Sequence, residues 1–194
     1  MNLAQWLVRR AQMSPKHPAL FEGLTPVADY AGFAAQARAV AGCLQRQGVA
    51  PGDRVAIYMG NCTSYLVVFY GIWIAGAVVV PINAKLHGRE AAFILDNSGA
   101  RQAFVDAKGA VALAGQTQGC QVIPLSDPGF EEVLEGSEVQ EVVYRDPDDL
   151  AWLFYTSGTT GKPKGVMITH GMLMSMALCY EADVEPMQAD DTIL

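Results

Sequence analysis

The residues in this sequence that are best suited to chemistry form one short run, TSGTTGKPKG, at residues 156–165. Its three glycines allow the backbone to turn tightly and to present N–H groups to an anion. Its four hydroxyl side chains can donate hydrogen bonds to phosphate oxygens, and one of them could bind a magnesium ion. Lys162 and Lys164 add positive charge, and no Asp or Glu occurs between Asp149 and Glu181. The run is therefore predicted to bind a polyphosphate.

The run does not follow the pattern of a Walker A loop. That pattern requires a glycine five residues before a Gly-Lys pair and a Ser or Thr directly after the pair. Here Thr156 stands five residues before Gly161, and Pro163 follows Lys162. A kinase or GTPase of the P-loop type is therefore disfavoured. A flexible surface loop with solubilising lysines is the simpler alternative, but it does not explain why the run directly follows a buried strand.

The segments around this run indicate the fold that must position it. Short apolar strands alternate with helices along the chain, and the run itself lies between two expected strands. The alternation predicts an α/β fold, with a parallel sheet flanked by helices on both faces. Ligands of such sheets bind in the loops at the carboxyl ends of the strands. Strands are expected at residues 55–58, 78–81, 102–105, 120–124, 150–155 and 166–169, and helices at residues 3–11, 30–47, 61–76 and 87–97.

One stretch allows a different interpretation, because residues 66–82 are almost wholly apolar and no charge occurs between Arg54 and Lys85. These 17 residues reach the lower length limit of a transmembrane helix. Gly76 is placed to end a helix, however, and the valines after it favour a strand that Pro81 closes. We expect a buried helix followed by a buried strand, and no transmembrane span.

Composition and charge disfavour several classes of protein. Hydrophobic residues make up 51% of the 194 residues and charged residues 17%, as in a globular domain. The formal net charge of −7 and the scattered Lys and Arg residues argue against nucleic-acid binding. Arg9 and Arg10 interrupt the apolar N-terminal segment, so no signal peptide is expected. The cysteines show no metal-binding spacing, so no metal site is expected from them, and they are predicted to be reduced core thiols in a cytoplasmic protein: Cys43, Cys62, Cys120 and Cys179.

The run TSGTTGKPKG resembles the phosphate-loop signature of the acyl-adenylate-forming (AMP-binding) superfamily. That superfamily contains acyl-CoA synthetases, adenylation domains of peptide synthetases and luciferases. Ten residues match, with both lysines and the proline in place. Residues 52–57, 75–83 and 94–100 are similar to the N-terminal subdomain of the CoA ligases of that family, long-chain fatty acid–CoA ligases among them. The resemblance covers essentially the whole chain.

The resemblance implies ATP-dependent conversion of a carboxylic acid to an acyl-adenylate and then to an acyl-CoA thioester, with ATP, Mg²⁺ and CoA taking part. A fatty acid is the expected substrate. An aryl-acid–CoA ligase, an amino-acid adenylation domain and a non-catalytic nucleotide-binding or interaction module remain alternatives. The phosphate-binding residues that the resemblance implies are Thr156, Ser157, Gly158, Thr159, Thr160, Gly161, Lys162 and, as an anchor of the loop or a late phosphate contact, Lys164.

The resemblance also sets expectations about what the chain contains. In the family, the catalytic Lys and an acidic magnesium ligand lie downstream of the part that this sequence matches, so its catalytic residues are unknown. Residues 1–194 are expected to be the N-terminal part of an AMP-binding domain, with little activity alone. An exposed sheet edge is expected to let the chain self-associate, for example as a homodimer.

Four smaller expectations concern single segments. Residues 24–28 are expected to interrupt a hairpin that the family forms. His170 is expected to be a helix cap or a packing contact, not an acid–base group. Cys179 is not expected to be a nucleophile. Four apolar residues after His170 are expected to fill the core: Met172, Met174, Met176 and Leu178.

Overall fold

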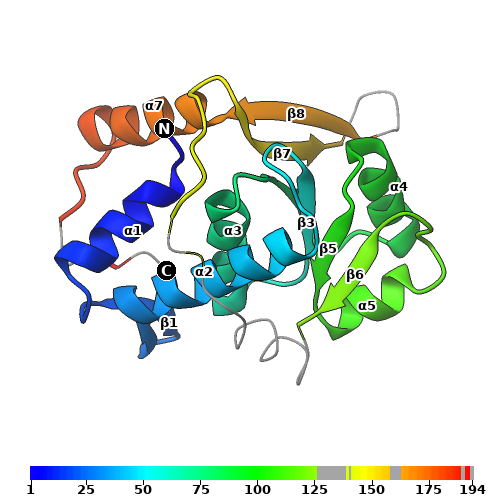
Figure 1. Cartoon of the computed structure of the whole chain (residues 1–194), viewed down its shortest axis with the longest axis horizontal. Coiled ribbons are helices and arrows are strands. Elements are labelled where there is room, and N and C mark those ends of the chain that lie inside the picture. Colours follow the sequence, from blue (N-terminus) through cyan, green and yellow to red (C-terminus); the bar gives the residue numbers. More distant parts are fainter. Residues whose placement is uncertain (126–138, 140, 158–162, 189–190, 193–194) are drawn as a thin grey trace.

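The computed structural model describes residues 1–125, 139, 141–157, 163–188 and 191–192. Within them, a six-stranded sheet with strand order β6-β5-β3-β4-β7-β8 forms the centre of the molecule (Figure 1). Five strands are parallel, and only β8 runs antiparallel to its neighbour. The predicted α/β class is confirmed. The strands are β3 (Arg54–Tyr58), β4 (Val78–Ile82), β5 (Gln102–Val105), β6 (Gln121–Pro124), β7 (Leu150–Thr156) and β8 (Lys164–Thr169).

Helices cover both faces of the sheet (Figure 1). Because successive residues of a strand point to opposite faces, each strand contributes to two cores. In β3, Val55 and Ile57 join the core on one face, whereas Ala56 and Tyr58 join the core on the other. The first core is shared with α1 (Ala4–Met13), α2 (Tyr30–Arg46) and α3 (Thr63–Ile74), and the second with α4 (Gly88–Ser98) and α5 (Ala107–Leu113).

The apolar stretch at residues 66–82 forms most of α3 and all of β4, as the sequence predicted. After α3, Gly76 takes a φ of 75°, a left-handed conformation that glycine adopts most readily. Gly71 lets α3 approach α2 closely, because a Cβ on this residue would lie 2.6 Å from the Cβ of Val40. Among the described residues, no helix is long and apolar enough to cross a membrane.

Two local features differ from expectation. Residues 24–28 do not interrupt the hairpin, because β1 (Pro18–Glu22) pairs antiparallel with β2 (Thr25–Asp29) around Gly23, whose φ is 57°. Two register shifts make the hairpin irregular, one with an extra residue in β1 between Pro18 and Leu20 and one with an extra residue in β2 between Pro26 and Ala28. The helix α5 was not expected from the sequence. Asp106 caps it by accepting a hydrogen bond from the N–H of Gly109 at 2.7 Å.

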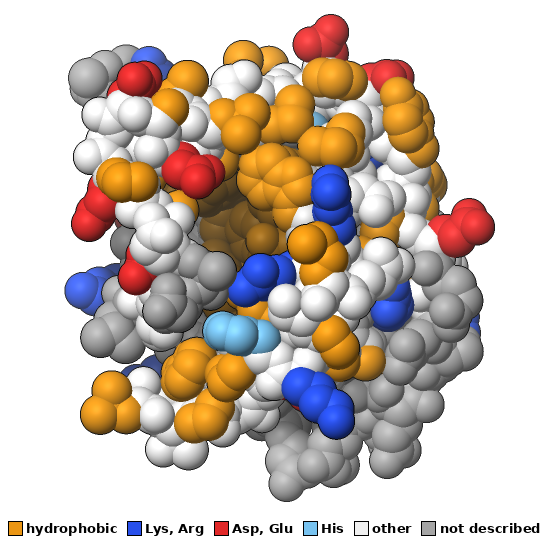
Figure 2. All heavy atoms as spheres, turned by 90° about the vertical axis from the view of Figure 1, so that its left-hand side faces the viewer, with side chains coloured by type: hydrophobic (Ala, Val, Ile, Leu, Met, Phe, Trp, Pro, Cys, Tyr) orange, Lys and Arg blue, Asp and Glu red, His pale blue; other side chains and the backbone are white. Residues whose placement is uncertain are grey.

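The helix α7 (His170–Asp183) corrects another expectation. Met172, Met176 and Leu178 are 58%, 62% and 59% exposed and do not fill the core, whereas Met174 is partly buried. Among the residues of α7, only His170 and Leu173 are fully buried. The reason is that α7 follows the edge strand β8, so one side of the helix faces away from the described part of the chain. Figure 2 shows hydrophobic side chains gathered around a hollow on this side of the molecule.

All four cysteines are free thiols. Cys43 is buried on α2, as expected, and Cys120 is half-buried. The expected core location is wrong for Cys62 and Cys179, which are exposed. Cys62 lies in the surface turn before α3, and Cys179 lies on the outer side of α7.

Candidate functional site

The run singled out in the sequence starts at the end of β7 and finishes in β8. The two strands pair antiparallel, and Thr156 lies opposite Lys164 in the ladder. Thr156, Ser157 and Lys164 are all exposed. The structure therefore brings the first and last predicted phosphate contacts together, with Ser157 directly after the pair. The remaining predicted contacts lie outside the described residues: Gly158, Thr159, Thr160, Gly161 and Lys162.

The pairing register places this hairpin at the carboxyl edge of the parallel strands. Val79 of β4 lies opposite Trp152 of β7. Tyr155, three residues further along, is therefore level with Ile82 at the end of β4, and Ile82 lies opposite Tyr58 at the end of β3. The segments that follow β3, β4 and β7 thus leave the sheet at one edge. This is the edge at which open α/β sheets bind their ligands.

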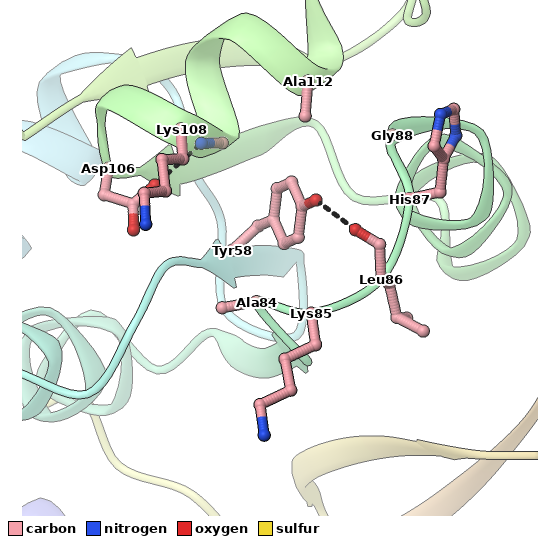
Figure 3. A pocket seen from close by; sticks show the side chains of 10 residues that line it. Tyr58, Ala84, Lys85, Leu86, His87, Gly88, Asp106, Lys108 and Ala112 are labelled. Carbon is pink, nitrogen blue, oxygen red and sulfur yellow. Dashed lines mark hydrogen bonds between the residues drawn. The ribbon is translucent and has the colours of Figure 1, made fainter.

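A hollow of about 390 Å³ opens at the same edge, between the segment after β4 and the start of α5 (Figure 3). The hydroxyl of Tyr58 donates a hydrogen bond to the carbonyl oxygen of Leu86 at 2.6 Å. Lys85, His87 and Lys108 also line the hollow, and Lys85 points away from Tyr58. None of these side chains was predicted from the sequence to be part of a binding site. Their positions in the sequence could have indicated them, because Tyr58 ends β3 and the other residues closely follow β4 or β5, at the edge where ligands bind.

Asp106 holds the end of β5 to the segment after β3. Its carboxylate accepts hydrogen bonds from the N–H groups of Gly109 at 2.7 Å and Gly60 at 3.0 Å. Burial alone would raise the pKa of Asp106. The pKa is nevertheless below its usual value, because the carboxylate accepts these two bonds and a third from the Lys108 backbone, and because the Lys108 charge is nearby. Asp106 is therefore ionised at neutral pH and serves as an acceptor. Burial, followed by the nearby Asp106 and Glu90 charges, raises the pKa of Tyr58.

A second hollow, of about 430 Å³, lies on the other face of the sheet, between α1, α3, β7 and α7 (Figure 2). Aromatic rings form its wall: Phe69 meets Trp73 edge-on at 4.6 Å and Trp152 at 5.8 Å between ring centroids. The indole N–H of Trp73 donates to the carbonyl oxygen of Ala151 at 2.9 Å, which fixes α3 to β7. Such a lining suits apolar groups. The lining residues are Leu3, Trp6, Tyr65, Leu66, Phe69, Tyr70, Trp73, Trp152, Leu173 and Met176.

His170 lies beneath this region as a packing contact, as expected. Its side chain is 1% exposed, and its Nδ1 accepts a hydrogen bond from the N–H of Leu3 at 3.3 Å. The helix cap is the preceding residue, Thr169, whose hydroxyl accepts from the N–H of Met172 at 3.2 Å. Burial, with the positive charges of Arg145 and the N-terminal amine, lowers the pKa of His170 to about 4 despite the opposing charge of Asp149. The ring is therefore neutral at physiological pH.

Comparison with known proteins gives the family. The chain matches the AMP-binding enzyme family over residues 7–194. It is 34% identical over 200 residues to the long-chain-fatty-acid–CoA ligase FadD13 of Mycobacterium tuberculosis, which covers 100% of this chain and 40% of that protein. It is 37% identical over 172 residues to a feruloyl-CoA synthase of Amycolatopsis sp, covering 89% of this chain and 34% of that protein.

Solved structures agree with the sequence match. The N-terminal domain of FACL13 from Mycobacterium tuberculosis aligns with a TM-score of 0.85 at 34% identity, over 95% of this chain and 48% of that chain. A benzoate CoA ligase from Burkholderia xenovorans aligns with a TM-score of 0.89 at 25% identity, over 98% of this chain and 39% of that chain. The chain thus spans 34% to 40% of the length of the two curated relatives. With a family match over nearly all residues, and with its signature on the β7–β8 hairpin, the chain belongs to the AMP-binding enzyme family.

Proposed function

We propose that this chain carries the ATP-handling part of an enzyme that activates a carboxylic acid and transfers the acyl group to CoA. The observation that supports this most directly is the pairing of Thr156 with Lys164 at the carboxyl edge of the sheet, in a chain of the AMP-binding family. The pairing gathers hydroxyl donors and a positive charge where α/β sheets bind ligands. The free thiols fit a reducing compartment such as the cytoplasm.

The proposed reaction has two steps. A carboxylate oxygen attacks the α-phosphorus of ATP, the bond from that phosphorus to the α–β bridging oxygen breaks, and pyrophosphate leaves. The CoA thiol then gives up its proton and attacks the acyl carbonyl carbon, and AMP leaves as the thioester forms. Both steps depend mainly on positioning and on stabilising negative charge.

The residues of the hairpin have distinct roles in this proposal. The hydroxyls of Thr156 and Ser157 donate to oxygens of the β- and γ-phosphates, and the Lys164 ammonium anchors the run or contacts a phosphate. The proposed contacts also include Gly158, Thr159, Thr160, Gly161 and Lys162. Their glycine, hydroxyl and lysine content is what a polyphosphate requires.

Mg²⁺ fits this set of groups as an ion bound mainly by phosphate oxygens. Magnesium in nucleotide sites keeps several waters and needs few protein ligands. A hydroxyl of Thr156 or Ser157 would supply one of them. Among the described residues, no group of three or more His, Cys, Asp or Glu side chains is placed to hold a metal. When bound, the ion would neutralise charge on the phosphates.

We propose a fatty acid as the substrate, since the relative matched over the whole chain is named a long-chain-fatty-acid–CoA ligase. An aromatic acid is the second candidate. It is favoured by the 37% identity to a feruloyl-CoA synthase and by the structural likeness to a benzoate CoA ligase.

The test is MgATP binding and acid-dependent ATP–pyrophosphate exchange, with a panel of long-chain, short-chain and aromatic acids. Lys164→Ala should weaken MgATP binding by about tenfold, as expected for one charge-assisted phosphate contact. Lys16→Ala removes an exposed lysine from the segment before β1 and should leave binding unchanged. The proposal fails if the chain does not bind MgATP or if both variants behave alike. Binding without exchange for any acid would favour a binding module over a ligase.

We also propose that the chain self-associates through β8, which is an edge strand of the sheet. Val166 and Met167 on this strand are 45% and 65% exposed. An edge of this kind presents unpaired backbone groups to another chain. Size-exclusion chromatography with light scattering should show a dimer or larger species at micromolar concentration. A monomer at every concentration would overturn this part of the proposal.

A further inference from the structure

Tyr155 stands where β7 leaves the sheet, and two other elements meet at its side chain. Its hydroxyl donates a hydrogen bond to Oδ1 of Asn97 at 2.7 Å, in the last turn of α4. Its ring faces β8, because a Cβ placed on Gly165 would lie 3.2 Å from Cζ of Tyr155. Gly165 is also its partner in the strand ladder. The ring and Cδ1 of Leu153, which would lie 3.1 Å from that Cβ, therefore occupy the space that a side chain at position 165 would need, and Tyr155 connects β7, β8 and α4.

Tyr155, Thr156, Lys164 and Gly165 form what we call the neck, the last two paired positions of the β7–β8 ladder. Among the strands that the structure describes, β8 lies at the edge of the sheet and pairs with β7 alone. Thr156 and Lys164 are exposed, so their own side chains are not fixed by burial. Tyr155 is half-buried and packs against the core beneath α4. Its hydroxyl connects the neck to a separate element, α4, by the hydrogen bond to Asn97.

We propose that Tyr155 is a positioning residue for the nucleotide. Its hydrogen bond to Asn97 and its contact with Gly165 keep the neck in the conformation that binds the phosphates. This inference rests on the proposed function of the hairpin. Tyr155 itself need not touch ATP. If the neck is already ordered before ATP binds, less conformational entropy is lost on binding, and the affinity is higher. Loosening the neck should therefore weaken nucleotide binding while leaving the rest of the fold intact.

The first experiment compares MgATP dissociation constants of variants of the whole chain. Tyr155→Phe keeps the ring and removes the hydroxyl, and should weaken binding by about threefold to tenfold, the worth of one hydrogen bond. Asn97→Ala should weaken binding by a similar factor. The double variant should be no weaker than either single variant, since both remove the same bond. Additive losses, or no loss, would overturn the proposal.

Tyr144→Phe is a matched control. The Tyr144 hydroxyl donates to Oδ1 of Asp146 at 2.7 Å, the same length as the Tyr155 bond, in the segment before β7. Its removal should leave MgATP binding unchanged. If Tyr144→Phe weakens binding as much as Tyr155→Phe, the effect is general destabilisation and the positioning role is wrong.

The second experiment needs no nucleotide. Backbone hydrogen exchange should be at least about threefold faster at the neck in Tyr155→Phe and Asn97→Ala than in Tyr144→Phe, with other strands unchanged. Gly165→Ala should act in the same direction by displacing the Tyr155 ring and the Leu153 side chain beside it. Equal exchange in all variants, or faster exchange throughout the sheet, would overturn the proposal. If the unaltered chain fails to bind MgATP, the proposed function falls, and exchange alone decides whether Tyr155 holds the neck.

Discussion

His170 should make the stability of this chain depend strongly on pH in the mildly acidic range. The side chain is 1% exposed and its Nδ1 accepts the N–H of Leu3, so the neutral ring carries its proton on Nε2. That Nε2 has no hydrogen-bond partner among the described residues. A second proton would place a charge in the core, close to Arg145 and the N-terminal amine and balanced only in part by Asp149.

The sign and the size follow from linkage. The pKa of His170 falls from 6.5 to about 4 on folding, so the unfolded chain binds the proton more readily. Stability from this group is therefore complete above pH 6.5 and is lost as the pH falls from 6.5 towards 4. With 1.36 kcal/mol per pKa unit, the loss is about 2 kcal/mol at pH 5 and about 3 kcal/mol once the pH is below 4.

The assay is urea unfolding at pH 7.5 and pH 5.0, for the unaltered chain and for His170→Leu. The variant loses the bond from Leu3 at both pH values, so the comparison uses the change with pH in each protein. The unaltered chain should lose about 2 kcal/mol more than His170→Leu between the two pH values. His17→Gln, which removes an exposed histidine, should behave like the unaltered chain. Equal pH dependence in the unaltered chain and His170→Leu would refute the reasoning.

Two further predictions concern packing. Asn2 is buried and donates to the backbone carbonyls of Trp73 and Val143 at 2.5 and 2.9 Å, so Asn2→Ala should remove both bonds and lower the free energy of unfolding by about 2 kcal/mol in urea titrations. A loss below 0.5 kcal/mol would mean that water replaces the amide. Gly71→Ala places a methyl group 2.6 Å from Val40 and should cost about 1 to 2 kcal/mol after the gain in helix propensity, seen as a lower Tm. Gly119→Ala, with no atom within 4 Å of the new Cβ, is its control and should change the Tm little.

The features that could be predicted from the sequence are those fixed by neighbouring residues. The apolar stretch broken at Gly76 gave a helix and a strand, because a left-handed glycine ends the helix whatever lies around it. The helix expected at residues 87–97 forms as α4, and Glu90 follows its N-cap, His87, by three residues. The structure shows the capping box this spacing allows, with the His87 N–H donating to Oε2 of Glu90 at 3.0 Å.

The features that could not be predicted depend on residues far apart in the chain. Tyr155 and Asn97 are 58 positions apart, and the local pattern around either does not name the other. The same holds for Asn2 and Trp73, which are 71 positions apart. Met176 shows a different limit: its apolar side chain favours burial, but the pattern does not say which element would cover it. The described residues leave it 62% exposed.

The pairing of Thr156 with Lys164 follows from the residues beside them. A slip of one position between β7 and β8 would move the side chains of one strand to the opposite face. It would also set Tyr155 opposite Lys164 or Val166 in place of Gly165. Gly165 is the one residue of β8 without a side chain, and Cζ of Tyr155 lies 3.2 Å from the position that a Cβ at residue 165 would take. Any other register loses this ring contact. A glycine and a tyrosine that bind no phosphate in this scheme therefore favour the register in which Thr156 lies opposite Lys164.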